Sequence, residues 1–314
     1  MAATGSKTKD KWFYLGPLFV IIGAALWGVE TKFRVGLNEK FDSEILVFYE
    51  HLFCLILAVP LALRSFKASL RAPRSSWTYL LLSGVLGSAV GTTFFTLSLT
   101  KLNASVANLL LNFQPIVSVI FANLLLREKL GRGFFVWSAM ALACGGVIAA
   151  DDFSFSLWQW NIGLLFTFIT ALTWGFSTVA GRGAMKFIPL GTASAGRFLF
   201  GGLAIFISLV VQGKFTGAFL KWPQLGDQHV IYNYLGLSII SGVVPLYFYF
   251  KGLSKTSATV AGFCELTQTF TALLVTWGFM GQPLTMHQVI AGLLLLVCVY
   301  MINLNFSKAN ASLR

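Results

Sequence analysis

GVLGSAVGTTFFTLSLTKLNASVANLLLNFQPIVSVIFANLLLREKL, residues 84–130, returns in large part as SIISGVVPLYFYFKGLSKTSATVAGFCELTQTFTALLVTWGFMGQPL, residues 238–284. Sliding one copy on the other at a constant offset of 154 pairs Lys101 with Lys255, Ala104 with Ala258, Val106 with Val260, Gln114 with Gln268 and Leu130 with Leu284. No gap is needed for this alignment. The chain is therefore an internal duplication, and we expect its function to lie between two related halves.

The duplication extends upstream of this stretch. GAALWGVETKF around Trp27 is similar to TALTWGFSTVA around Trp174, and HLFCLILAV from His51 is similar to RFLFGGLAI from Arg197. Five apolar segments per half are implied. A unit with an odd number of membrane crossings places its second copy upside down, a geometry typical of transporters. We predict a first five-helix repeat over residues 1–150 and a second over residues 151–314.

Composition places the chain in the membrane. Of its 314 residues, 56% are hydrophobic and 11% are charged, whereas soluble domains contain about 25% charged residues. Apolar runs of the length that a bilayer requires fall near residues 15–35, 43–63, 77–98, 104–126, 133–150, 160–181, 192–212, 231–251, 257–280 and 285–306. The predicted fold class is all-α integral membrane, with ten transmembrane helices arranged as two inverted five-helix repeats.

The net charge of +12 is distributed through short connections and not gathered on one face, which argues against nucleic acid as a partner. Sixteen basic residues fall on one predicted side: Lys7, Lys9, Lys11, Arg64, Lys67, Arg71, Arg74, Arg127, Lys129, Arg132, Arg182, Lys186, Lys251, Lys255, Lys308 and Arg314. The other side holds six, together with Asp151 and Asp152: Lys32, Arg34, Lys40, Lys101, Lys214 and Lys221. This bias predicts that both termini lie in the cytoplasm. We expect the membrane to be a bacterial inner membrane.

The four cysteines, Cys54, Cys144, Cys264 and Cys298, lie in apolar runs without CxxC spacing. The sequence therefore indicates neither a disulfide framework nor a metal site, and we expect no cofactor. The first apolar run is too long for a signal-peptide core, so we expect it to remain as the first helix.

Ionisable residues within apolar runs are candidate functional residues, because they are costly in lipid. In the outer half of the membrane these are Glu30, Glu50 and His51, which we assign to coupling or gating. Glu30 has a simpler alternative, an i,i+4 ion pair with Arg34 that closes the helix end. His51 has one as well, since a membrane histidine is often a structural hydrogen-bonding residue.

In the inner half, Arg197 and Glu265 lie at comparable predicted depths, and an ion pair between them would lower the cost of burying both. We assign Arg197 to coupling or gating and Glu265 to substrate binding. The alternative for Arg197 is that its side chain extends to the headgroups. Tyr247 and Tyr249 supply aromatic surface for a cavity wall or for the interfacial belt.

The fourth helix carries one polar stripe formed by Ser105, Asn108 and Asn112, beside Gln114 and Pro115. The proline is expected to kink the span. The stripe either lines a cavity or holds helices together by hydrogen bonds. Gly84, Gly87, Ser88 and Gly91 lie on nearly one face of the third helix and indicate a packing seam, with cavity lining as a second alternative.

The order of these features, WG in the first helix, a proline within the fourth and the ending LLREKL, resembles the drug/metabolite transporter superfamily, specifically its ten-helix EamA-type branch. The resemblance covers nearly the whole chain. It implies a central cavity lined mainly by helices 1, 3, 4, 6, 8 and 9, and export or exchange of small metabolites. Two departures lie in the second half, where Thr269 stands in place of Pro115 and Gln282-Pro283 in place of Glu128-Lys129. Such families commonly have a basic residue, often arginine, in the place of His51.

We therefore predict a secondary transporter of small polar or zwitterionic metabolites, with amino acids favoured, that works by alternating access and uses protons as a candidate coupling ion. Its predicted substrate-binding residues are Trp27, Asn108, Asn112, Gln114, Trp174, Tyr247, Glu265 and Gln268. Phosphorylated or nucleotide-type substrates are an alternative within transport. An intramembrane enzyme is the alternative from another class, but HExxH and GxSxG motifs are absent from the sequence. The expected partners are a metabolite and the lipid bilayer, and the oligomeric state stays open, with a monomer compatible.

Overall fold

The structure is a computed structural model that describes residues 7–127, 129–131, 133–149, 161–215, 226–253 and 264–310. These residues form helices and connecting turns, with no strand among them. Several residues that enter the orientation and repeat predictions lie outside the described residues: Arg132, Asp151, Asp152, Lys221, Lys255, Ala258, Val260 and Arg314.

Consecutive helical segments join into ten spans within the described part of the chain. In the first half these are α1 (Lys7–Gly28) with α2 (Glu30–Asn38), α3 (Ser43–Ser69), α4 (Arg74–Leu82) with η1 (Ser83–Gly91) and α5 (Thr92–Ser98), α6 (Ala104–Leu110) with η2 (Leu111–Phe113) and α7 (Gln114–Leu126), and α8 (Phe134–Ala149). In the second half they are α9 (Ile162–Met185), α10 (Leu190–Val211), α12 (Gln228–Leu235) with η3 (Gly236–Val243) and α13 (Val244–Leu253), α15 (Thr267–Met280), and α16 (Met286–Asn310).

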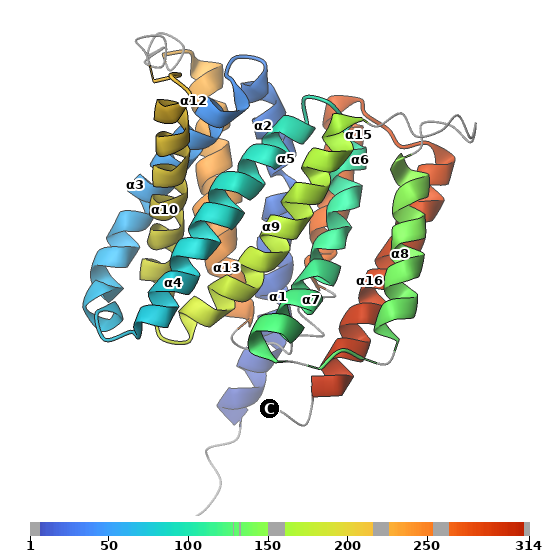
Figure 1. The fold of residues 1–314 in the computed structure, drawn as a ribbon, viewed down its shortest axis with the longest axis horizontal. Coiled ribbons are helices and arrows are strands. Elements are labelled where there is room, and N and C mark those ends of the chain that lie inside the picture. The colour runs from blue at the N-terminus through green and yellow to red at the C-terminus, as the bar shows by residue number, and fades with distance from the viewer. Residues whose placement is uncertain are drawn as a thin grey trace, which may run out of the picture.

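The spans confirm the predicted all-helical membrane fold. Seven helices in the described residues are long and apolar enough to cross a bilayer, and Phe134–Ile148 is a shorter apolar helix. Figure 1 shows the spans running side by side in alternating directions, with the start of α1 and the end of α16 both at the lower end of the view. We call this end the terminal end and the opposite one the distal end. The first spans of the two halves, α1 and α9, run in opposite directions, as inverted repeats require.

The third span of each half contains a π-helical stretch at matching positions, η1 in residues 83–91 and η3 in residues 236–243. A π-turn closes its backbone hydrogen bonds over five residues instead of four, and carbonyl oxygens of η1 also accept hydrogen bonds from side-chain donors outside the helix. Three such donors come from α9: Ser177 Oγ, Trp174 Nε1 and Thr170 Oγ1 donate to the carbonyl oxygens of Ser83, Gly87 and Gly91 at 3.1, 2.9 and 3.3 Å. A Cβ atom at Gly87 would lie 2.1 Å from Ser177 Oγ, so the glycines form a tight packing seam.

The WG dipeptides form reciprocal contacts between the halves. A Cβ atom on Gly28 would lie 2.5 Å from the carbonyl oxygen of Gln268, and one on Gly175 would lie 3.0 Å from that of Gln114. Each half thus places the first of its spans against the glutamine of the other half's fourth span. The absence of a side chain at both glycines permits this close approach.

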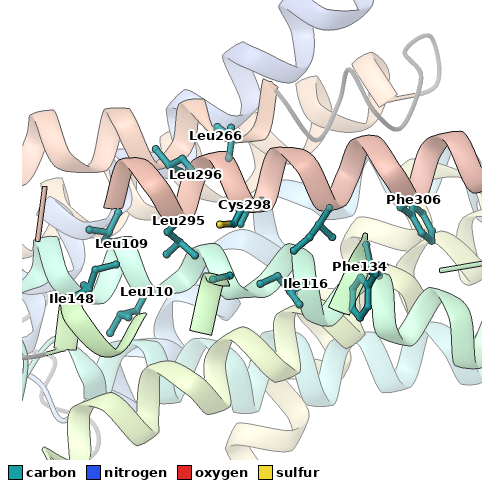
Figure 2. Close-up of a cluster of buried hydrophobic side chains, with 14 of the residues drawn as sticks. Leu109, Leu110, Ile116, Phe134, Ile148, Leu266, Leu295, Leu296, Cys298 and Phe306 are labelled. Atoms are coloured by element: carbon teal, nitrogen blue, oxygen red, sulfur yellow. The ribbon is translucent and has the colours of Figure 1, made fainter. Parts of the chain in front are cut away.

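The largest hydrophobic cluster packs α16 against α6, α7 and α8 (Figure 2). Leu109, Ile116, Phe134, Leu295 and Phe306 belong to it. The fourth span is interrupted just before Pro115 by the three-residue 3₁₀ turn η2, which lies where the sequence predicts a kink.

Candidate functional site

A cavity of about 230 Å³ lies between the two halves. Its polar and aromatic lining includes Trp27, Glu30, Arg34, Glu50, His51, Thr92, Gln114, Ser118, Trp174, Ser177, Thr178, Arg182, Arg197, Ser241, Tyr249, Glu265, Gln268 and Asn303. In addition to the spans that the resemblance implies, the second and seventh spans contribute through α3 and α10, and the tenth through α16. The tenth span supplies Asn303 and Phe306 near its terminal end.

Arg34 is the most completely paired cation of the cavity. Its two terminal amino groups donate to both carboxylate oxygens of Glu50 at 2.8 and 2.9 Å, and one of them also donates to Thr96 Oγ1 at 2.9 Å. Glu30 lies one turn before Arg34 at 3.7 Å, so the expected i,i+4 pair is present but secondary. The guanidinium is only 1% exposed, and a bidentate carboxylate partner repays much of the cost of burying it.

An apolar and aromatic cluster covers this charge group on the distal side. Phe41, Tyr49 and Tyr234 are buried and contact one another edge to face, with ring centroids 5.6–6.4 Å apart. Leu37 and Leu46 belong to the same cluster and are fully buried. The distal end of the cavity is therefore closed by packed side chains above a buried ion pair.

His51 and Arg197, which the sequence alignment pairs, both line the cavity near the contact between α3 and α10. His51 Nδ1 lies 2.7 Å from the carbonyl oxygen of Val47, so Nδ1–H is the donor, and Nε2 is buried beside Gly201 without a hydrogen-bond partner among the described residues. Arg197 Nε donates to Ser88 Oγ at 2.9 Å. Within the described part of the chain, the ion pairs include none that involves Arg197.

Glu265 does not pair with Arg197, and this prediction is wrong. Its Oε1 accepts a hydrogen bond from the Tyr249 hydroxyl at 2.5 Å. Arg182, from the last turn of α9, lines the same cavity and attracts Glu265 electrostatically. Arg197 and Glu265 have comparable predicted depths. The partners of Glu265 nevertheless come from α13 and α9, which supply Tyr249 and Arg182.

Aromatic and amide side chains related by the duplication contribute to the cavity walls. Trp27 packs against Tyr249 with ring centroids 4.9 Å apart, and Trp174 packs against Phe95 at 5.3 Å. Gln114 and Gln268 also line the cavity. The wall therefore offers flat apolar surfaces together with amide groups that donate and accept hydrogen bonds.

Three residues expected on the cavity wall lie elsewhere. Asn108 Nδ2 donates to Thr31 Oγ1 at 3.0 Å, and Asn112 Oδ1 accepts from Thr269 Oγ1 at 2.9 Å, so the asparagine stripe holds spans together. Tyr247 is 43% exposed and carries a cation–π contact with Lys251 at 5.4 Å. Each belongs to the alternative that the sequence left open for it, interhelical hydrogen bonds for the asparagines and the outer surface for the tyrosine.

Arg34 and Arg182 are cavity residues that the sequence did not identify as site residues, whereas Tyr249 lines the cavity, which is one of its two expected positions. Arg34 and Arg182 lie near the ends of predicted spans, where basic residues are normally explained by membrane orientation. An additional signal for Arg34 was available, because Glu30 lies four residues before it on the same helix face. Among the described residues, no group of His, Cys, Asp and Glu is arranged to hold a metal ion.

Comparisons with known proteins agree with this architecture. The sequence model of the EamA-like transporter family matches residues 14–150 and again residues 161–304. Riboflavin transporter ImpX of Fusobacterium nucleatum is 26% identical over 299 residues, covering 92% of this chain and 97% of that protein. An uncharacterized transporter of Clostridium kluyveri is 23% identical over 305 residues, covering 93% of this chain and 94% of that protein.

A solved crystal structure superposes with a TM-score of 0.64 at 18% identity, covering 91% of this chain and 95% of that one, and it shares the fold. The family and both named relatives are transporters, which leaves the alternative of an intramembrane enzyme without support. The matches and the apolar spans together identify a multi-pass integral membrane protein that moves a small molecule.

Proposed function

The chain belongs to the EamA-like transporter family, and from this premise we propose that it exports or exchanges small zwitterionic metabolites, amino acids first among them. Transport proceeds by alternating access between the repeats of residues 1–150 and 151–314. The membrane is the bacterial inner membrane, and both termini lie in the cytoplasm, consistent with the bias of basic residues toward the terminal end.

Unequal pairing of the cavity charges carries this proposal. Arg197 lines the cavity with a hydroxyl as its hydrogen-bond partner, so its terminal amino groups are available to a carboxylate. Glu30 lies 3.7 Å from Arg34, whose closer contacts go to Glu50, so Glu30 retains capacity for an ammonium group. A zwitterion carries both groups, a carboxylate for Arg197 and an ammonium for Glu30. We assign the ammonium to Glu30 instead of Glu265, because the latter is engaged with Tyr249.

The shape of the cavity supports a state closed on the distal side. Toward the terminal end, the lining continues to Arg182 and to Asn303 and Phe306, close to the ends of their helices. Toward the distal end, the lining stops at Arg34 and Glu50 beneath the aromatic cluster. Opening the distal side requires separation of α2 from α3, and therefore loss of the Arg34–Glu50 ion pair.

Protons are the proposed coupling ion, with His51 as the residue that exchanges them. Its Nε2 atom is buried beside the cavity without a partner among the described residues, which leaves one position for a proton. His51→Ala is expected to abolish uptake driven by a pH gradient while leaving substrate counterflow intact, because counterflow requires no net proton movement. If flux through the unmodified protein does not respond to a pH gradient, the coupling role is wrong.

A flat heteroaromatic metabolite such as riboflavin is the second candidate. A curated relative is named a riboflavin transporter. The tryptophans at positions 27 and 174 offer ring faces for stacking, and Gln114 and Gln268 offer amide groups that match the polar edges of such rings. Phosphorylated metabolites are a weaker alternative, although Arg182 and Arg197 supply two cavity arginines.

Counterflow into vesicles that contain only the purified protein distinguishes these substrates. We expect accumulation of at least one radiolabelled amino acid, loss of that accumulation in Arg197→Gln, and normal accumulation in the control Lys101→Gln, whose side chain lies outside the cavity lining. Accumulation of riboflavin alone would contradict the amino-acid proposal and favour a flat heteroaromatic substrate. Accumulation of phosphorylated metabolites alone would contradict both.

A further inference from the structure

α3 is longer than a membrane span needs to be. It contains 27 residues, or about 40 Å of helix, whereas the hydrocarbon core of a bilayer is about 30 Å thick. The apolar run predicted from the sequence ends at residue 63, so residues 64–69 extend beyond it at the terminal end. About two turns of α3 therefore lie beyond its apolar run.

These turns and the connection after them are basic. Arg64, Lys67, Arg71 and Arg74 are all exposed, and we call these four residues the basic turn. The sequence contains no Asp or Glu between His51 and Arg127. Within the described residues, the ion pairs involve none of these four cations. The basic turn is thus a local concentration of positive charge without an acidic residue nearby in the sequence.

The side chains around the basic turn separate into three stripes at the 100° spacing of a helix. Ser65 and Ser69 face the protein, where Ser65 Oγ lies 3.0 Å from Thr192 Oγ1 and Ser69 is fully buried. On the outside, one stripe is apolar and exposed, and consists of Leu63, Phe66 and Leu70. The adjacent outside stripe of α3 holds Arg64 and Lys67, and Arg71 follows in the turn after the helix. An apolar stripe beside a basic one matches acyl chains beside anionic headgroups.

We propose that the basic turn binds the headgroups of anionic phospholipids in the leaflet at the terminal end. The argument is one of charge complementarity and position, since four exposed cations follow the apolar run closely and lie beside the exposed side chains of Leu63, Phe66 and Leu70. Phosphate groups accept hydrogen bonds from arginine and lysine at this level, and each cation near the surface adds to the attraction. This surface is independent of the cavity and of the proposed substrate.

The test measures the association of spin-labelled phosphatidylglycerol and spin-labelled phosphatidylcholine with the full-length protein in phosphatidylcholine vesicles. We expect the unmodified protein to favour phosphatidylglycerol by about three- to tenfold at low salt, and to lose most of this preference at about 1 M salt because the attraction is screened. The variant R64Q/K67Q/R71Q/R74Q should bind both lipids equally.

Two control variants show whether the charge at this position matters. R64K/K67R/R71K, with Arg74 left as it is, keeps every positive charge and should keep the preference. K40Q/K214Q removes two cations from the distal end that are already paired with Asp227 and Glu44, and should leave the preference unchanged. If the fourfold glutamine variant fails to accumulate, the single variants R64Q, K67Q and R71Q should each lower the preference part of the way.

Several outcomes overturn the proposal. The first is an unmodified protein that does not distinguish the two lipids, and the second is a glutamine variant that retains the full preference. Displacement of the labelled lipid by millimolar inorganic phosphate would show that the basic turn is a site for soluble anions and not for a membrane surface.

Discussion

Arg34 and Arg197 line the same cavity, yet they are held in different ways. Arg34 is bound by both oxygens of Glu50 and by Thr96, whereas Arg197 is held through Nε by the hydroxyl of Ser88. Burying a guanidinium costs desolvation energy. A carboxylate partner offsets this cost directly, and in a cavity a bound substrate or water offsets it. In the proposed mechanism the paired arginine closes one end of the protein, and Arg197, which has no acidic partner among the described residues, is the one available to a substrate.

Removal of Arg34 tests the closing role and should have the largest effect. Arg34→Leu leaves Glu50 buried without its partner, and we expect a loss of about 3–5 kcal/mol in the free energy of unfolding. Thermal unfolding of the purified protein in detergent measures this loss. The double variant R34L/E50L should recover much of it, because no unpaired carboxylate remains at position 50. Equal instability of the single and double variants would argue against the ion pair as the cause.

Removal of Arg197 tests the binding role. Arg197→Gln should weaken substrate binding by about tenfold to 100-fold, as expected for loss of a charge-assisted pair, with little change in thermal stability. Binding and stability are measured on the same preparation by counterflow and by thermal unfolding. Ser88→Ala, which removes only the hydrogen bond to Nε, should have a smaller effect on binding. A large drop in stability together with normal binding would reverse the comparison between the two arginines.

The seam beside Ser88 offers a test of smaller size. Gly87→Ala introduces a Cβ atom that would lie 2.1 Å from Ser177 Oγ, and overpacking of this kind costs about 1–3 kcal/mol. The shift should also displace Ser88 and so weaken binding at Arg197. Gly146→Ala is the matched control, because nothing lies within 4 Å of a Cβ atom there, and it should leave unfolding and binding nearly unchanged.

The smallest effect is expected for an ion pair outside the membrane. Lys40 donates to Asp227 at the distal end, and this hydrogen bond holds the pKa of Asp227 below its usual range. Because the folded pKa is lowered, the pair contributes stability above the ordinary aspartate pKa and loses it as pH falls through the folded value. The midpoint of thermal unfolding should fall slightly more on acidification than it does in Asp227→Asn. High salt should remove this difference, in contrast to the buried pair of Arg34.

The fold follows from the sequence because membrane spans are recognisable one at a time. The length of each apolar run indicates a membrane span without reference to the rest of the chain. The repeat at an offset of 154 residues, with five spans in each copy, indicates the inversion without knowledge of any long-range contact. The expected and observed boundaries of α10 therefore agree within two residues. Those of α3 agree at its start, and the helix extends six residues beyond the predicted run at its terminal end.

The site follows less completely, because partners depend on the rotation of each helix about its axis. Arg197 and Glu265 have similar depths, yet Ser88 and Tyr249 are their neighbours. Asn112 is polar enough for a cavity wall, but its side-chain oxygen accepts a hydrogen bond from Thr269, the residue that stands in place of Pro115 in the second half. Neither arrangement has a signature in hydropathy or spacing.

The reciprocal contacts of the WG dipeptides also constrain the order of assembly during synthesis. Gly28 emerges from the ribosome early, but its partner, the backbone of Gln268, follows about 240 residues later. At roughly 5–20 residues per second this is a wait of roughly 12–48 s. During that interval the face of α1 that will meet the ninth span has no permanent neighbour, and lipid or the insertion machinery must occupy it. The cavity is therefore completed only when the chain is nearly finished.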